Sequence, residues 1–146
     1  MDKSATGNML LAIDTATATA SVALYDIKSD LLLAECTWQA RRRHTEELLT
    51  TTQGLMAQLE VSPSQLSSLA VTTGPGSFTG VRIGLSVIKG IGVGLPQPPQ
   101  VVGIPTLTVT AAPWLPLAQA ASAQLWTYIQ AGRGRYNWAI FTEKLY

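Results

Sequence analysis

Short apolar segments alternate with polar or small-residue turns along the first third of the chain. Residues 9–13, 20–25 and 31–37 are rich in aliphatic side chains and have lengths typical of strands. A few turn-forming residues separate them, 15–19 after the first segment and 26–30 after the second. Three strands joined by turns this short predict an antiparallel meander.

The spacing of apolar residues then changes to that of helices alternating with single buried strands. The expected elements are helices over 45–60, about 80–94 and 106–112, and strands over 68–71 and 101–104. Ser77 or Thr79 is a candidate N-cap of the second helix, because its side-chain oxygen can accept a bond from a free helix N–H. The order βββαβαβ predicts an α/β fold, a mixed sheet with helices packed on its faces, as a first domain over residues 1–112.

The last part of the chain has a different pattern. Pro113 and Pro116 mark a boundary, and the segments 124–130 and 135–142 predict two strands of a hairpin around residues 132–134. A lone hairpin is marginally stable by itself. Residues 113–146 are therefore expected either to pack on the first domain or to begin a second lobe that is incomplete in this chain, which would then be a fragment of a longer protein.

The second helix is unusual because its glycines recur at helical spacing. At about 100° per residue, one side carries four glycines and three β-branched residues, namely Gly80, Gly84, Gly90, Gly94, Ile83, Val87 and Ile91. Each glycine costs about 1 kcal/mol of helix propensity, so the run needs a reason. Two reasons stay open at this point: a surface on which a helix of another protein docks, or a tight packing contact inside the chain.

Composition narrows the class of protein. Of 146 residues, 47% are hydrophobic and 13% charged, and the net charge is +1, so there is no general electrostatic argument for binding nucleic acid. The single cysteine, Cys36, excludes an intrachain disulfide and suits a reducing compartment. The polar start does not resemble a signal peptide, and the apolar runs are shorter than the roughly 20 residues of a membrane span.

Asp14, at the end of the first predicted strand, is the best catalytic candidate, because a carboxylate there can hold Mg²⁺ in a small-substrate ATPase or kinase. The competing reading is a polar cap of the following turn. No Asp or Glu occurs between Glu60 and Glu143, whereas two-metal nucleases and phosphoryl-transfer sites need further carboxylates. The turn also has Ala16 and Ala18 where phosphate-binding turns favour glycine. The turn cap is the preferred interpretation.

A glycine-rich loop leads into the second helix, and such a loop is a ready anion site. It lacks the Lys-Ser/Thr ending of a phosphate loop, and Ser77 has no neighbouring histidine to activate it. We therefore predict at most a vestigial nucleotide loop, made by Asp14, Thr15, Gly74, Gly76 and Ser77. No metal site and no cofactor of the chain's own is expected.

Two strings carry a resemblance to a known family: Ile13-Asp14-Thr15-Ala16-Thr17 near the start, and residues 73–84, Thr-Gly-Pro-Gly-Ser-Phe-Thr-Gly-Val-Arg-Ile-Gly. Together with the βββαβαβ order, they resemble TsaB (YeaZ), the bacterial family that takes part in making threonylcarbamoyladenosine in tRNA. The second string is the specific one. The resemblance covers nearly the whole chain after Gly7 and implies an actin-like (ribonuclease H-like) fold of two lobes, the second incomplete here.

The resemblance also implies a non-catalytic role as partner of the paralogous catalytic subunit TsaD, with the TsaE-type ATPase in the complex and a homodimer when the chain is alone. It implies that the two long helices form the partner interface, through Leu48, Thr52, Leu55, Met56, Gly80, Ile83, Gly84, Val87, Gly90, Ile91 and Gly94. An ATP or ADP site is expected only at the interface with the partner, tRNA contact is expected to be indirect or weak, and the location cytoplasmic without a membrane.

The remaining candidate residues give weaker evidence for a functional site. Aligned to the catalytic paralogue, its metal-binding His-x-x-x-His falls on Thr106 and Thr110, and threonine is a poor ligand for a transition metal. His44 has no Cys or His partner nearby in sequence. The basic cluster 41–43 reads as a solvated loop rather than a phosphate site. The tryptophans of the last part, Trp114, Trp126 and Trp138, are expected in the core of the second lobe.

Overall fold

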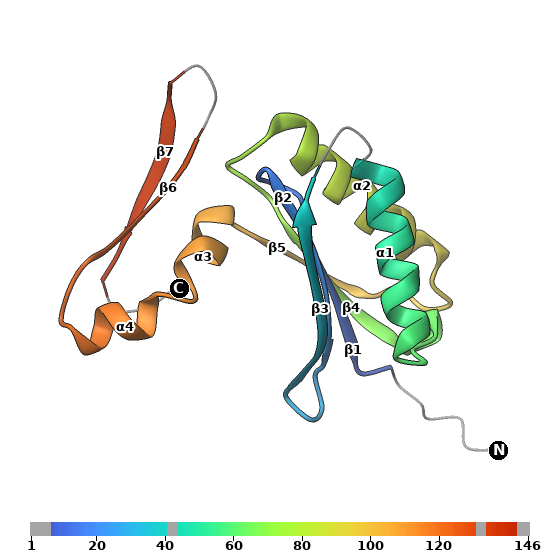
Figure 1. The fold of residues 1–146 in the computed structure, drawn as a ribbon. Coiled ribbons are helices and arrows are strands. Elements are labelled where there is room, and N and C mark those ends of the chain that lie inside the picture. Colours follow the sequence, from blue (N-terminus) through green and yellow to red (C-terminus); the bar gives the residue numbers. More distant parts are fainter. Residues whose placement is uncertain (1–6, 41–43, 131–133, 143–146) are drawn as a thin grey trace.

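A five-stranded sheet and two long helices make up the larger part of the chain in the computed structural model, which describes residues 7–40, 44–130 and 134–142 (Figure 1). The strands are β1 (Met9–Asp14), β2 (Thr19–Asp26), β3 (Leu31–Gln39), β4 (Leu66–Thr72), β5 (Gln100–Ile104), β6 (Leu125–Gln130) and β7 (Tyr136–Phe141). The helices are α1 (His44–Gln58), α2 (Phe78–Gly94), α3 (Thr106–Ala111) and α4 (Leu115–Ala120), with a 3₁₀ turn at Pro63–Gln65. The predicted element order is confirmed; α4 and the 3₁₀ turn were not predicted.

The sheet is mixed, as predicted. Its strand order is β3-β2-β1-β4-β5. Strands β1, β2 and β3 pair antiparallel as the short turns required, whereas β1–β4 and β4–β5 are parallel and are reached through the two long helices. The carboxyl ends of β1 and β4 therefore lie side by side, which brings the turn after Asp14 next to the loop after Thr72.

Both long helices cover the same face of the sheet (Figure 1), whereas the sequence analysis expected helices on its faces in general. The physical reason is handedness. Each crossover moves outward in the same direction, from β3 to β4 and from β4 to β5, and right-handed crossovers in one direction put their helices on one side. Beneath them lies the core, formed by alternate residues of β1 and β2 with the inner sides of the helices: Leu11, Ile13, Val22, Leu24, Leu48, Leu69, Val71 and Ile88.

The β2–β3 turn is closed by a side chain. Asp26 Oδ1 accepts hydrogen bonds from Asn8 Nδ2 at 2.7 Å and from the Lys28 backbone N–H at 2.9 Å. Hydrogen bonds from Ser29 contribute most to lowering the pKa of Asp26, and those from Lys28 and Asn8 act in the same direction, although desolvation opposes them. Next to it, the Tyr25 hydroxyl donates to Asp30, and this bond raises the pKa of the tyrosine.

The hairpin β6–β7 stands beside the five-stranded sheet as a separate two-stranded sheet. One of its faces packs on α3 and buries Thr127 and Ile129. The other face carries two aromatic pairs with exposed rings: Trp126 stacks on Trp138 at 5.3 Å, and Tyr128 meets Tyr136 edge to face at 5.7 Å between ring centroids.

The expectation that the tryptophans form a lobe core is wrong for this chain. Trp126 and Trp138 alternate with the buried residues of their strands, so they face away from α3, and 58–60% of each side chain is exposed. Trp114, between α3 and α4, is equally exposed. Nothing in the described part of the chain covers this aromatic face.

Candidate functional site

Helix α2 begins at Phe78, slightly before the predicted start at about residue 80, because Ser77, the first of the two predicted N-cap candidates, caps it. The Ser77 Oγ accepts a hydrogen bond from the Gly80 backbone N–H at 3.1 Å, which satisfies one of the free donors of the first turn. The preceding Gly74 adopts φ of +97°, a conformation that favours glycine. The loop thus places the start of α2 at the carboxyl ends of β1 and β4.

The turn after β1 packs directly on the first half of α2. The Thr15 hydroxyl donates to the Gly80 carbonyl oxygen at 2.8 Å, and the Ser77 backbone N–H donates to the Ala16 carbonyl oxygen at 2.7 Å. Thr15 and Ala16 are 1% and 0% exposed. This contact needs glycines, because a Cβ on Gly80 would overlap the Thr15 carbonyl oxygen.

This contact corrects the predicted partner interface at two glycines. A Cβ on Gly84 would come within 2.5 Å of the Thr15 Oγ1, so the space beside Gly80 and Gly84 is filled from inside the chain. Leu48 and Thr52 of α1 are buried as well, at 0% and 3% exposure, with the Thr52 hydroxyl bonded to the Leu48 carbonyl. These four residues have no surface to offer a partner, and we remove them from the predicted interface.

The second half of α2 is different. No atom lies within 4 Å of a Cβ built on Gly90 or Gly94, and the Val93 side chain is 88% exposed. The other predicted interface residues lie at the edge of the core and are partly or largely buried; they are Leu55, Met56, Ile83, Val87 and Ile91. We call residues 78–88 the packed half of α2 and residues 89–94 the exposed half. The exposed half and these edge residues remain the predicted interface.

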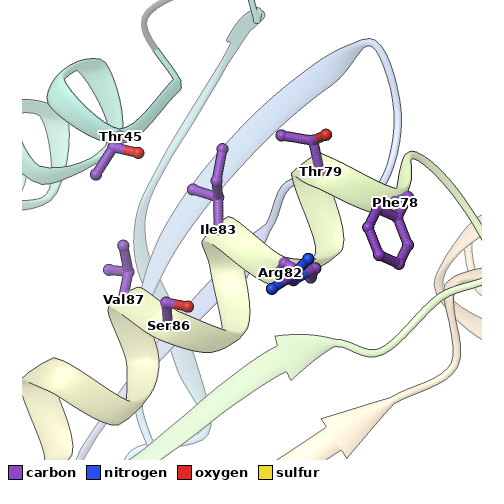
Figure 2. A pocket seen from close by; sticks show the side chains of 7 residues that line it. All are labelled: Thr45, Phe78, Thr79, Arg82, Ile83, Ser86 and Val87. Carbon is purple, nitrogen blue, oxygen red and sulfur yellow. The ribbon is translucent and has the colours of Figure 1, made fainter.

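A groove runs along the outer side of the packed half, between α2 and the start of α1 (Figure 2). Its volume is about 470 Å³, and it is lined by Thr45, Phe78, Thr79, Arg82, Ile83, Ser86 and Val87. The Arg82 guanidinium carbon lies 5.1 Å from the centroid of the Phe78 ring. Sequence reasoning missed this groove, although one signal was present: Arg82 is the single charge in the first ten residues of the helix.

Asp14 occupies the end of β1 as a structural group. Its Oδ1 accepts hydrogen bonds from the Ala16 backbone N–H at 2.9 Å and from the Thr72 hydroxyl at 2.8 Å. The first of these bonds is the turn cap that the sequence analysis preferred. The carboxylate therefore connects the turn after β1 to the end of β4.

The predicted vestigial nucleotide loop comes together in space but does not fit a nucleotide on its own. A Cβ on Gly76 would overlap the Ala16 carbonyl oxygen, so the place where a phosphate would approach the loop is taken by the chain's own turn. The Ser77 amide and hydroxyl are also engaged, as described above. These contacts leave no free cradle of amides between the two loops, and we derive no chemical step through a nucleotide.

The other candidate residues of the sequence analysis do not form a functional site in the part of the chain that the structure describes. Among the described residues, no three His, Cys, Asp or Glu side chains lie close enough to hold a metal ion. The Thr110 hydroxyl donates to the Thr106 carbonyl at 2.9 Å, while the buried Thr106 hydroxyl has no partner among the described atoms. Cys36 is a free, partly buried thiol on β3. The basic cluster 41–43 and Arg133 lie outside the described residues.

Comparison with known proteins decides the family. The matching family model is described as "TsaD: tRNA N6-adenosine threonylcarbamoyltransferase", and it matches residues 38–143. The chain belongs to this family. Its curated relatives include TsaB proteins: the protein of Escherichia coli K12 is 34% identical over 134 residues, 89% of this chain, and that of Haemophilus influenzae is 37% identical over 76% of it. The resemblance to TsaB is confirmed.

A solved structure shares the fold. YeaZ from Pseudomonas aeruginosa superimposes with a TM-score of 0.80 and 28% sequence identity, over 94% of this chain and 61% of that one. The α/β fold predicted for this TsaB relative is thereby confirmed as the fold of YeaZ. The chain spans about half the length of the curated relatives it matches, 53% of the E. coli protein and 45% of the H. influenzae protein. In the described part of the chain, no helix combines the length and hydropathy that crossing a membrane requires.

Proposed function

We propose that this chain is a non-catalytic partner subunit in the synthesis of threonylcarbamoyladenosine in tRNA, and that it binds a TsaD-type catalytic subunit through the outer sides of α1 and α2. The observation that carries the proposal is the exposed half of α2. There the Gly90 backbone is uncovered beside the 88% exposed Val93 side chain. A helix surface that has no side chain at Gly90, next to an exposed valine, allows another helix to approach closely.

The names of the relatives support the same role. The E. coli and H. influenzae relatives are named tRNA threonylcarbamoyladenosine biosynthesis proteins, and the family model that matches this chain describes the threonylcarbamoyltransferase itself. A chain that shares its family with a transferase but lacks the His-x-x-x-His of the catalytic paralogue suits an accessory subunit better than a second enzyme. Its threonines at those positions are poor metal ligands.

The engagement of Asp14 supports a role without chemistry of the chain's own. Its carboxylate is bonded to the Ala16 amide and the Thr72 hydroxyl, and the neighbouring loop is filled by Ala16. The proposal includes the further expectations of the family: a homodimer when the chain is alone, a TsaE-type ATPase in the complex, any ATP or ADP site at the interface with the partner, indirect or weak tRNA contact, and a cytoplasmic location.

The first experiment measures binding of the chain to the TsaD-type subunit of the same genome by isothermal titration calorimetry. Gly90→Leu adds a side chain to this helix surface without touching the core. Because the added side chain keeps the partner helix at a distance, we expect the dissociation constant to rise by about 30-fold or more. Thr37→Leu adds the same side chain at an exposed position of β3 and should change binding by less than about twofold. Equal binding by the wild type and Gly90→Leu would reject this interface.

A second experiment addresses the alternative, an ATPase or kinase that uses Asp14 for Mg²⁺. We expect calorimetry of the isolated chain with Mg-ATP to show no binding at micromolar concentrations. Tight binding that Asp14→Ala abolishes, with the variant still folded by circular dichroism, would favour the enzyme and contradict the accessory role.

A further inference from the structure

The groove beside α1 combines an apolar floor with one cation. Its lining combines the aliphatic side chains of Ile83 and Val87 with the hydroxyl-bearing side chains of Thr45, Thr79 and Ser86. Figure 2 shows Ile83 and Val87 directed toward α1, with Arg82 and Phe78 together near the start of α2. A groove of about 470 Å³ has room for one or two side chains of another protein.

The Arg82 guanidinium lies against the Phe78 ring and has no acceptor among the described residues. It lies 5.1 Å from the centroid of the Phe78 ring, which positions the planar group by a cation–π contact. Among the described residues, Arg82 makes no hydrogen bond and no ion pair. Its five N–H donors therefore remain available in a fixed fork, the geometry that matches a carboxylate bidentately.

Helix α2 itself carries no acid that could pair with Arg82. Helix α2 has two cations, Arg82 and Lys89, and no acid, and the chain has no Asp or Glu between Glu60 and Glu143. On α1, the facing element, the acids of the first turn are Glu46 and Glu47. The Glu47 carboxylate accepts a hydrogen bond from the Trp38 indole N–H at 3.3 Å, and both acids lie where the helix dipole favours them.

We propose that this groove receives a carboxylate side chain, Asp or Glu, from a helix of the TsaD-type partner, and that the Arg82 guanidinium binds it as a bidentate ion pair beside Ile83 and Val87. This ion pair rests on the proposed function, because it would be the contact that makes the complex with the TsaD-type subunit specific. Arg82 lies on a different face of α2 from Gly90. The partner carboxylate replaces water on a guanidinium that the Phe78 ring already orients, so the pair costs little side-chain entropy. The apolar walls exclude water around it and so strengthen the pair.

The test is the affinity for the purified TsaD-type subunit, measured at 50 mM and 300 mM salt. We expect Arg82→Glu to weaken binding by about 30-fold or more, because it places two carboxylates in one groove. Lys28→Glu is the matched control: it makes the same change in net charge at an exposed position of the β2–β3 turn, outside the groove and outside both long helices. We expect it to weaken binding by less than about threefold, and by less still at high salt.

Arg82→Lys separates charge from geometry. It keeps the charge and loses the fork and the ring contact, so we expect a loss of about fivefold. A charge swap then identifies the partner residue: an Asp or Glu of the TsaD-type subunit, changed to Arg, should restore binding of Arg82→Glu to within about threefold of the wild type. Circular dichroism and thermal unfolding should show each variant folded, since the Arg82 side chain is exposed.

The outcomes keep the two proposals apart. Absence of binding by the wild-type chain overturns the proposed function. Wild-type binding that Arg82→Glu and Lys28→Glu weaken equally overturns the carboxylate groove alone, because the effect is then general electrostatics. A change in self-association of Arg82→Glu with undiminished binding to the TsaD-type subunit also overturns it, since the groove then serves a second copy of this chain.

Discussion

The two halves of α2 use the same residue for opposite purposes. In the packed half, Gly80 and Gly84 lie against Thr15, and a Cβ on either would overlap the turn after β1. In the exposed half, a Cβ on Gly90 or Gly94 would meet nothing within 4 Å. The helical wheel puts all four on one side, yet the sheet edge covers that side over only half of its length.

The difference teaches that glycine spacing along a helix does not separate internal packing from a docking surface. The sequence left both readings open, and the structure separates the two halves of the glycine side: the turn after β1 covers Gly80 and Gly84, whereas nothing within 4 Å covers a Cβ built on Gly90 or Gly94.

Gly80→Ala should be the most damaging single change. The added methyl group overlaps the Thr15 carbonyl oxygen, so the turn after β1 and the start of α2 must separate. Overpacking of this kind in a rigid backbone contact costs about 3 kcal/mol of unfolding free energy. Urea unfolding followed by circular dichroism measures it, and a loss smaller than about 0.5 kcal/mol would show that the two segments are not packed as described.

Ser77→Ala tests how the packed half begins. The variant removes the oxygen that accepts the Gly80 N–H, and loss of such a cap costs about 1 kcal/mol. Ser77→Asp is the control, because a carboxylate can cap the same N–H and should keep most of the stability. Urea unfolding of both variants should rank them with Ser77→Asp above Ser77→Ala; the reverse order would mean that the Ser77 side chain does not cap the helix.

Thr15→Val tests the hydrogen bond between the turn and the helix. Valine keeps the shape of threonine and loses the donor to the Gly80 carbonyl, which should lower the unfolding free energy by about 1 kcal/mol. Thr15→Ser keeps the hydroxyl but loses a methyl group in a buried site. If Thr15→Val proved as stable as the wild type in urea unfolding, the bond would contribute nothing to the contact.

Gly90→Ala should have the smallest effect and the opposite sign. The methyl group enters empty space, and alanine is the better helix former, so the isolated chain should gain about 0.5–1 kcal/mol in unfolding free energy. Thermal unfolding should show a higher midpoint for Gly90→Ala and a lower one for Gly80→Ala. A destabilised Gly90→Ala variant would contradict the division of α2 into two halves.

Much of the fold follows from local pattern. The lengths of the apolar segments, the turn residues between β1, β2 and β3, and the Ser77 cap are all visible in the sequence, and the structure has them. What the pattern could not give is which surfaces meet. Whether Gly80 packs on Thr15 depends on β1 and β4 being neighbours in the sheet, a relation between residues 65 positions apart.

The exposed aromatic face of the hairpin and the groove beside α1 were missed for the same reason. Alternation along β6 and β7 shows that Trp126 and Trp138 share a face, but it does not say whether anything covers that face, and here nothing in the described part of the chain does. The groove joins Thr45 to Arg82 across two helices that are not adjacent in sequence. The only sign of it in the sequence was Arg82, the single charge among the first ten residues of α2.

The most direct test of the account replaces Gly90 with a photo-crosslinking amino acid, benzoylphenylalanine, and irradiates the chain with the TsaD-type subunit. Thr37 of β3 carries the same group in a parallel sample as the exposed control. The account predicts a covalent adduct with the TsaD-type subunit from position 90 and none from position 37. Adducts from position 37 with none from position 90 would contradict it.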